Sequence, residues 1–237
     1  MELLLKTNNN SPIINNIPEL IKFGYEFEYN FIITSPHPKL TLEQLFLSHN
    51  RSLSLGKACK IILETLITIE TLHNNNIIHR DINPKVFSID SKEKIKFINL
   101  GFWKYYKNKN KHIEFKFYKK MIGKNIIFGS INNLIGFELS RRDDLQSLSY
   151  MLIYFIKGYL PWDCIDIKNS EDKIKKILEM KKNISDDLLI EGLPNDIKLF
   201  ISYTKRLKFE EEPDYNYLKN ILKNLINSKD SYKNFYF

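Results

Sequence analysis

The spacing of apolar residues changes character along this chain. Near the start, two runs at 19–25 and 29–34 carry β-branched and aromatic residues around an acidic turn, which predicts two strands. Thr41 is a candidate N-cap for a short helix through Phe46. After Ser54, a candidate N-cap, apolar positions recur every three or four residues and predict a helix; they are Ala58, Ile61, Ile62, Thr65, Leu66, Ile69 and Leu72.

The second half of the chain is predominantly helical in pattern. Two short strand-like runs at 86–89 and 94–98 precede a Lys-rich segment with little periodicity, from Gly101 to about Ser130. Helical periodicity then returns in four segments: 143–157, 171–182, 195–206 and 215–227. Because few strands come first and many helices follow, the pattern predicts an α+β fold.

Composition indicates a packed protein with a basic surface. Its 237 residues, 43% hydrophobic and 13% aromatic, suffice for one core or two packed lobes. The net charge of +8 arises almost wholly from lysine. That balance favours acidic partners, although a solvated Lys-rich surface gives the same composition.

Neither the cysteines nor the apolar runs indicate a secreted or membrane protein. Cys59 and Cys164 are too few and too isolated for a disulfide framework or a metal site, so we expect reduced, partly buried thiols. The first residues lack the features of a signal peptide, and the most apolar run, 145–156, is interrupted by polar residues and predicts a buried helix. We therefore expect an intracellular protein, cytoplasmic or nuclear, without membrane contact.

The string Ile78-His79-Arg80-Asp81-Ile82-Asn83-Pro84-Lys85-Val86 carries the candidate chemistry. It resembles the catalytic loop of protein kinases, written H-R-D-x-K-P-x-N, in which the Asp accepts a proton, the Lys steadies the transferring phosphate and the Asn holds Mg²⁺. Asp81 keeps the proton-acceptor position. Asn83 stands where the Lys belongs, and Val86 where the Asn belongs. A general bias of the chain toward asparagine is a rival explanation for Asn83.

Further strings resemble the casein kinase 1 family and its vaccinia-related relatives over about residues 17–227. Those kinases write S-I-N and then S-R-R-D-D-L; here the matching strings are 17–24, 41–46, 130–138, 140–145, 158–162 and 207–215. The resemblance implies a protein-kinase-like fold, mainly the helical C-terminal lobe with a truncated N-terminal sheet lobe. It divides the chain into a sheet-lobe remnant at 1–36, a casein kinase 1-like lobe at 37–230 and a tail at 231–237.

The resemblance also assigns structural roles around the loop. Asp144 matches the buried acid of the long central helix that anchors the catalytic loop, although a helix N-terminus favours an acid in any case. We expect His79, Arg80 and Arg142 to be structural as well. Asp81 is then a vestigial proton acceptor.

Several catalytic parts of a kinase do not match. Asn99 stands at the metal-binding Asp of D-F-G, and an amide oxygen brings no negative charge to Mg²⁺. Lys124 stands where the activation-segment Thr belongs, and no G-x-G-x-x-G occurs. Glu2 is a candidate for the helix Glu that holds the nucleotide Lys, or simply a solvated residue. We expect an N-terminally shortened protein, or a truncated gene model, that needs no cofactor.

Three functions are therefore open. The first is a pseudokinase that binds or scaffolds other proteins, with acidic proteins as candidate partners. The second is a residual serine/threonine kinase that uses Mg-ATP with Asp81 as the base. The third is a Lys-rich anion- or nucleic-acid-binding module, in which aromatic residues at 105, 106, 115, 117 and 118 interleave with lysines. We do not expect nucleic acid as the partner. The candidate partner-binding residues are Lys107, Lys109, Lys111, Lys119 and Lys120.

Overall fold

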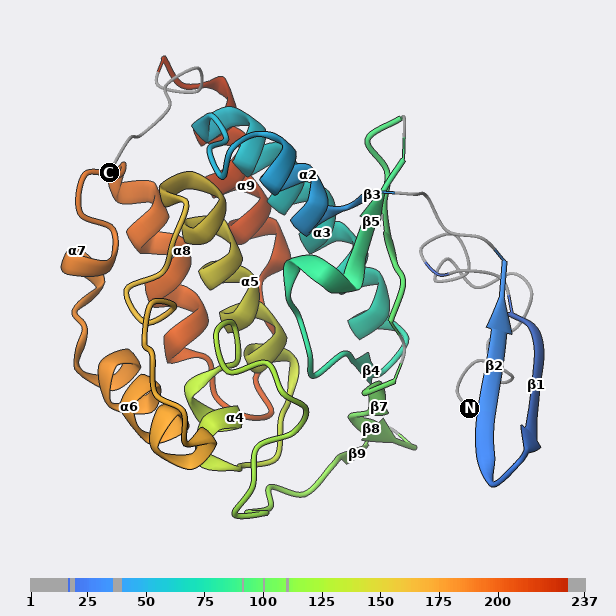
Figure 1. The fold of residues 1–237 in the computed structure, drawn as a ribbon. Helices are drawn as coiled ribbons and strands as arrows, with labels where there is room; N and C mark the ends of the chain where they lie inside the picture. The colour runs from blue at the N-terminus through green and yellow to red at the C-terminus, as the bar shows by residue number, and fades with distance from the viewer. Residues whose placement is uncertain are drawn as a thin grey trace.

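The computed structural model describes residues 17, 20–35, 40–90, 92–99, 101–109 and 111–229. Within them, helices pack around α5 (Arg141–Lys157), which Figure 1 shows between α3 (Leu55–Asn74), α8 (Asn195–Arg206) and α9 (Tyr215–Asn227). Every residue of α5 from Leu145 to Ile156 is buried. The predicted α+β fold and buried central helix are confirmed, because α3 and α8 bury their apolar faces against α5 and α9 packs on α3.

Two strands form a hairpin to one side of the helices. β1 (Leu20–Glu26) pairs antiparallel with β2 (Tyr29–Thr34), as the sequence predicts, and the turn lies at Phe27 and Glu28, both with positive φ. Most of its described side chains are exposed, including large apolar ones. A two-stranded hairpin of this kind is marginal by itself.

The predicted helix starts carry the predicted caps. Thr41 begins α2 (Leu42–Ser48) with a capping box, since its hydroxyl accepts from Gln44 N and the Gln44 side chain accepts from Thr41 N. Ser54 caps α3 through Lys57 N. The helix predicted from 143 starts two residues earlier, because the Asp143 carboxylate accepts a hydrogen bond from Ser140 N at 2.8 Å and caps the start of α5.

Short strands support the loops between the helices. β5 (Phe87–Ile89) pairs with β6 (Ile95–Phe97) and with β3 (Leu40–Thr41), so the two predicted runs are strands, and Val86 belongs instead to the 3-10 turn η2 (Pro84–Val86). The Lys-rich segment holds further two-residue strands that periodicity does not predict. β4 (Ile77–Ile78) pairs with β7 (Lys104–Tyr105), and β8 (Lys107–Asn108) with β9 (Lys111–His112).

The remaining helices follow the pattern with small shifts. α6 (Ser170–Asn183) is capped by Asn169, and α8 and α9 begin and end as predicted. Two helices of less than two turns, α4 (Ile131–Ile135) and α7 (Asp186–Leu189), were not predicted. They are too short for a periodic signal.

Some expectations are corrected and others lie outside the described residues. Both cysteines are free, and Cys59 is buried, but Cys164 is exposed, so its predicted partial burial is wrong. No helix in the described part of the chain is long and apolar enough to cross a membrane. Glu2 and the domain boundaries predicted at 36/37 and 230/231 lie outside the described residues.

Candidate functional site

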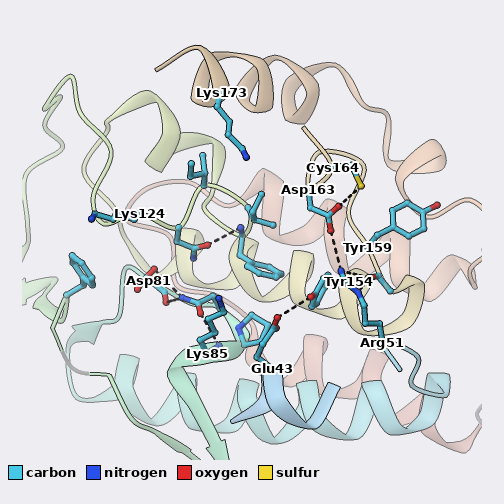
Figure 2. A pocket seen from close by; sticks show the side chains of 18 residues that line it. Glu43, Arg51, Asp81, Lys85, Lys124, Tyr154, Tyr159, Asp163, Cys164 and Lys173 are labelled. Carbon is cyan, nitrogen blue, oxygen red and sulfur yellow. Dashed lines mark hydrogen bonds and ion pairs between the residues drawn. The ribbon is translucent and has the colours of Figure 1, made fainter. Parts of the chain in front are cut away.

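Asp81 lies at one end of an open cavity of about 1120 Å³. Figure 2 shows the cavity running from Asp81 to Tyr159 and Cys164, past Glu43 of α2 and Tyr154 of α5. The Asp81 side chain is nearly buried, and burial raises its pKa to about 6, against the opposing hydrogen bonds from Asn83 and Asn125. The position retained from the kinase motif therefore faces a space that a ligand can enter.

Asn83 is occupied with local backbone contacts. Its Nδ2 donates to the Asp81 carbonyl oxygen at 2.9 Å and approaches Asp81 Oδ1 at 3.3 Å, while its Oδ1 accepts from Lys85 N at 3.0 Å. It thus caps η2 and braces Asp81. An amide in this arrangement supplies no positive charge to a phosphate.

Val86 and Asn99 occupy the two positions that hold magnesium in the kinase motif. Val86 is 2% exposed and packs in the hydrophobic core, and its side chain has no donor atom. The Oδ1 of Asn99 accepts from Gly101 N at 3.0 Å, so its one ligand-type oxygen is already engaged in a turn. Within the described residues, no group of three or more His, Cys, Asp or Glu side chains is arranged to hold a metal ion.

These residues do not fit Mg-ATP. Magnesium requires hard oxygen ligands, usually one or two carboxylates, and the two positions supply one neutral, engaged oxygen between them. Asn83 also replaces the lysine that would bring a positive charge to the transferring phosphate. No phosphoryl-transfer step can therefore be derived from these side chains.

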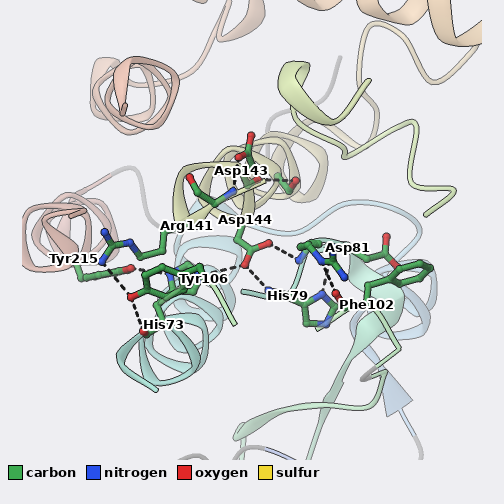
Figure 3. A network of polar contacts seen from close by, with 12 residues as sticks. His73, His79, Asp81, Phe102, Tyr106, Arg141, Asp143, Asp144 and Tyr215 are labelled. Carbon is green, nitrogen blue, oxygen red and sulfur yellow. Dashed lines mark hydrogen bonds and ion pairs between the residues drawn. The ribbon is translucent and has the colours of Figure 1, made fainter. Parts of the chain in front are cut away.

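The carboxylate of Asp144 binds the backbone of the loop at 79–83. Its two carboxylate oxygens accept from His79 N at 2.7 Å and Arg80 N at 2.8 Å, and Oδ2 also lies 3.0 Å from His73 Nε2 (Figure 3). Burial opposes its ionisation, but the hydrogen bond from His73 and the other contacts lower the pKa of Asp144. Arg80 has a φ of 69°, an unusual conformation for a non-glycine residue that these bonds stabilise.

His79 is a buried, neutral ring. It stacks on Phe97 with ring centroids 5.0 Å apart, and burial lowers its pKa to about 4. Nδ1 accepts from Asp81 N at 3.2 Å, so Nε2 carries the proton and donates to the Asn99 carbonyl oxygen at 3.1 Å. His79 therefore links the loop to the Asn99 turn.

A second layer of polar residues, which the sequence reasoning missed, supports Asp144. His73 Nδ1 lies 2.7 Å from the hydroxyl of Tyr215, which donates to it because Nε2 faces Asp144. Tyr106 donates to the His73 carbonyl oxygen at 2.8 Å, and the Arg141 guanidinium lies 4.7 Å from the Tyr106 ring centroid. These four residues come from four elements or loops, so their spacing in the sequence carries no signal.

The two arginines of the S-R-R-D-D string separate. Arg141 joins this network and donates to the carbonyl oxygens of Glu210 and Glu211. Arg142, predicted beside the site, instead lies over the Phe209 ring at 5.6 Å. Its polar contacts are with the Asp143 carboxylate at 3.7 Å and the Leu207 carbonyl oxygen at 3.5 Å.

Arg80 points toward the Lys-rich segment. Its Nε donates to the Phe102 carbonyl oxygen at 2.6 Å. Nearby, the buried Glu138 accepts from Lys104 Nζ at 2.7 Å and from the Tyr118 hydroxyl at 2.6 Å. Of the five candidate partner-binding lysines, Lys107 is half-buried, and Lys109, Lys111, Lys119 and Lys120 are exposed.

A buried lysine fixes one wall of the cavity. Lys181 of α6 is 1% exposed, and its ammonium donates to the carbonyl oxygens of Ile126, Ile127 and Gly129 at 3.1, 2.8 and 2.6 Å. It also faces the Tyr150 and Trp162 rings at 4.7 and 4.9 Å. Burial lowers the pKa of Lys181 well below its usual value, yet three acceptors require three protons, which only the ammonium form carries.

This α+β domain has an H-R-D loop whose backbone N–H groups donate to a buried aspartate of the central helix. That combination defines a protein-kinase-like protein. A family model described as the protein kinase domain matches residues 2–231. The chain therefore belongs to the protein kinase domain family.

Proposed function

We propose that this chain is a casein kinase 1-like protein kinase homologue that has lost useful phosphoryl transfer and acts as a protein-binding or scaffolding module. Val86 carries the first part of this proposal, because a buried valine at a metal position has no atom that can bind Mg²⁺. Asn83 and Asn99 add the loss of a cation and of a carboxylate.

Contacts between the two strings of the resemblance support the subfamily. Ser130 and Asn132, from S-I-N, donate to Oδ1 of Asp143 at 2.7 and 2.9 Å. Asp143 comes from S-R-R-D-D, where it also caps α5. The strings that resemble casein kinase 1 thus form one buried unit at the start of α5, independent of the catalytic positions.

The surviving scaffold supports a binding role. Asp144 still binds the backbone of the loop at 79–83, and Lys181 still binds the carbonyl oxygens of the cavity wall. The two metal positions, by contrast, have lost their carboxylate and amide ligands. Lys85, Lys124 and Lys173 line the cavity, and none of them forms an ion pair among the described residues. A preserved surface without its chemistry favours recognition of another protein over turnover.

A residual serine/threonine kinase is the second candidate, and one observation favours it. Asp81 faces the cavity, and its pKa of about 6 lets it exchange a proton near neutral pH. Such a base still requires an oriented nucleotide. Each missing electrostatic contact lowers the rate of a reaction by about 10²–10³-fold. The residues at positions 83, 86 and 99 therefore argue against the residual-kinase function.

A thermal shift measurement with Mg-ATP tests the loss of the nucleotide site. At about 1 mM Mg-ATP we expect no change in the melting temperature of the native chain or of Asn99→Asp, because Val86 and Asn83 remain in both. Mg²⁺ alone and ADP without metal are the controls. An upshift of about 2–4 °C, which a binding free energy near 1 kcal/mol would give, would contradict the proposal.

A further inference from the structure

The segment from Phe115 to Tyr118 forms an exposed edge beside the Lys-rich hairpin β8–β9. Phe117 makes an antiparallel bridge with Phe137, in which Tyr118 N donates to the Gly136 carbonyl oxygen and Glu138 N donates to that of Lys116, both at 2.7 Å. We call residues 115–118 the aromatic edge. All four side chains of this edge are exposed.

The bridge leaves hydrogen-bonding groups unused. In a non-hydrogen-bonded antiparallel pair, the N–H and C=O of the central residue point away from the partner strand. Phe117 is such a residue, and its backbone makes no hydrogen bond among the described residues. An unpaired donor and acceptor on an extended segment are a template for one more strand.

Apolar surface accompanies this free backbone. Phe115 and Phe117 are 52% and 55% exposed, and their rings lie 5.1 and 5.4 Å from the Phe137 ring. Phe115 also meets Phe209 edge-on at 5.2 Å. The aromatic side chains therefore form a supported, half-open platform on one face of the edge.

The surroundings are strongly positive. The sequence from 104 to 124 holds eight lysines and one acidic residue, Glu114. Lys104 is neutralised by Glu138, and Lys116 lies 3.8 Å from Glu114. Lys109, Lys111, Lys119 and Lys120 form no ion pair within the described part of the chain. The charge around the edge is thus complementary to carboxylates.

We propose that the aromatic edge binds an extended acidic segment of a partner protein as an added β-strand. Backbone bonds to Phe117 would give the strand its register, apolar side chains would cover the phenylalanine platform, and carboxylates would meet the unpaired lysines. A polynucleotide would use the charge but has no extended peptide backbone with which to add a strand beside Phe117. The inference rests on the protein-binding part of the proposed function.

A labelled peptide of about nine residues that alternates Glu and Leu is the probe, since that length spans a typical strand. Binding to the full chain is followed by fluorescence anisotropy. A second peptide carries N-methyl groups on the alternate amides that would face Phe117. We expect saturable binding of the first peptide and about tenfold weaker binding of the second, because one or two backbone hydrogen bonds are lost.

Two five-lysine variants separate local charge from net charge. The test variant changes Lys107, Lys109, Lys111, Lys119 and Lys120 to Gln. The matched control changes five exposed lysines on other elements: Lys60, Lys168, Lys182, Lys223 and Lys229. We expect about tenfold weaker binding by the test variant and native binding by the control, with unchanged melting temperatures in both. Phe117→Ser should weaken binding without removing the lysines.

Other outcomes overturn the inference. Equal affinity for the two peptides would exclude strand addition. Tighter binding of an oligouridylate than of the peptide would make the segment an anion surface, and concentration-dependent dimerisation that blocks the peptide would make a second copy its occupant. Failure of the peptide together with absent Mg-ATP binding would overturn this inference alone, whereas Mg-ATP binding would overturn the proposed loss of catalysis and leave the edge intact.

Discussion

At the scale of single residues, the two aspartates of the loop region have opposite electrostatic situations. Asp144 accepts two backbone N–H bonds and a bond from His73, so its charge is stabilised. Asp81 is nearly as buried but receives only the weaker bonds of Asn83 and Asn125, so its pKa rises. Asp144 thus supports the fold, whereas the charge on Asp81 lowers the stability of the folded state.

The first residue-level prediction follows from this contrast. A raised carboxyl pKa makes the folded state bind more protons than the unfolded one between about pH 4 and about pH 6, so stability falls as pH rises through that window. Asp81→Asn should therefore raise the unfolding free energy at pH 7 by about 1 kcal/mol and leave it unchanged at pH 4. Chemical denaturation at both pH values measures this.

Asp144→Ala is the matched comparison. It should lower the unfolding free energy at pH 7 by roughly 1–3 kcal/mol, because the buried N–H groups of His79 and Arg80 lose their acceptor. Stabilisation by Asp144→Ala, or a loss of stability at pH 7 in Asp81→Asn, would reverse the roles that we assign to the two carboxylates.

At the scale of elements, the sequence predicts those whose signals are local. Thr41, Ser54 and Asn169 cap helices that repeat apolar residues over several turns, so their starts follow from a few neighbouring residues. The pairing of β4 with β7 joins residues 28 and 26 positions apart and depends on tertiary packing. Two-residue strands offer no period to detect.

The candidate site is predictable only in part, for a related reason. The positions of Asp81, Asn83, Val86 and Asn99 follow from motif resemblance, because those motifs are contiguous. The network beneath them joins His73 to Tyr215, separated by 142 residues, and no spacing rule reveals such a contact. Lys181 was missed because a lysine inside a polar helix normally lies on its solvated face.

The prediction at the scale of elements concerns Lys181, which binds the segment 126–129 to α6. Lys181→Met keeps the apolar stem but removes the donors to three carbonyl oxygens of the segment 126–129. Amide hydrogen exchange should therefore accelerate by about tenfold or more at 124–130, where local bonds such as Gly129 N to Asn125 O must open, and stay unchanged in α9. Equal acceleration in both places, or none, would mean that Lys181 does not fasten the cavity wall.

At the scale of the whole molecule, a kinase scaffold persists around a catalytic loop with altered chemistry. Helix α5 still organises the core, supplies Asp144 to the loop and supplies Tyr154 to the cavity. The substitutions fall instead at positions that would touch metal or phosphate. This distribution is what we expect if, as we propose, the family fold is retained while phosphoryl transfer is lost.

Transfer of labelled γ-phosphate from ATP tests this central claim most directly. Native protein and Asp81→Asn, both checked for equal folding, are incubated with Mg-ATP or Mn-ATP and an acidic protein substrate, and phosphate incorporation is counted for the chain and the substrate. We predict the same background for both proteins, because the side chains at 83, 86 and 99 cannot orient the nucleotide for Asp81. Incorporation by the native protein that Asp81→Asn abolishes would contradict the account and establish the chain as a working kinase.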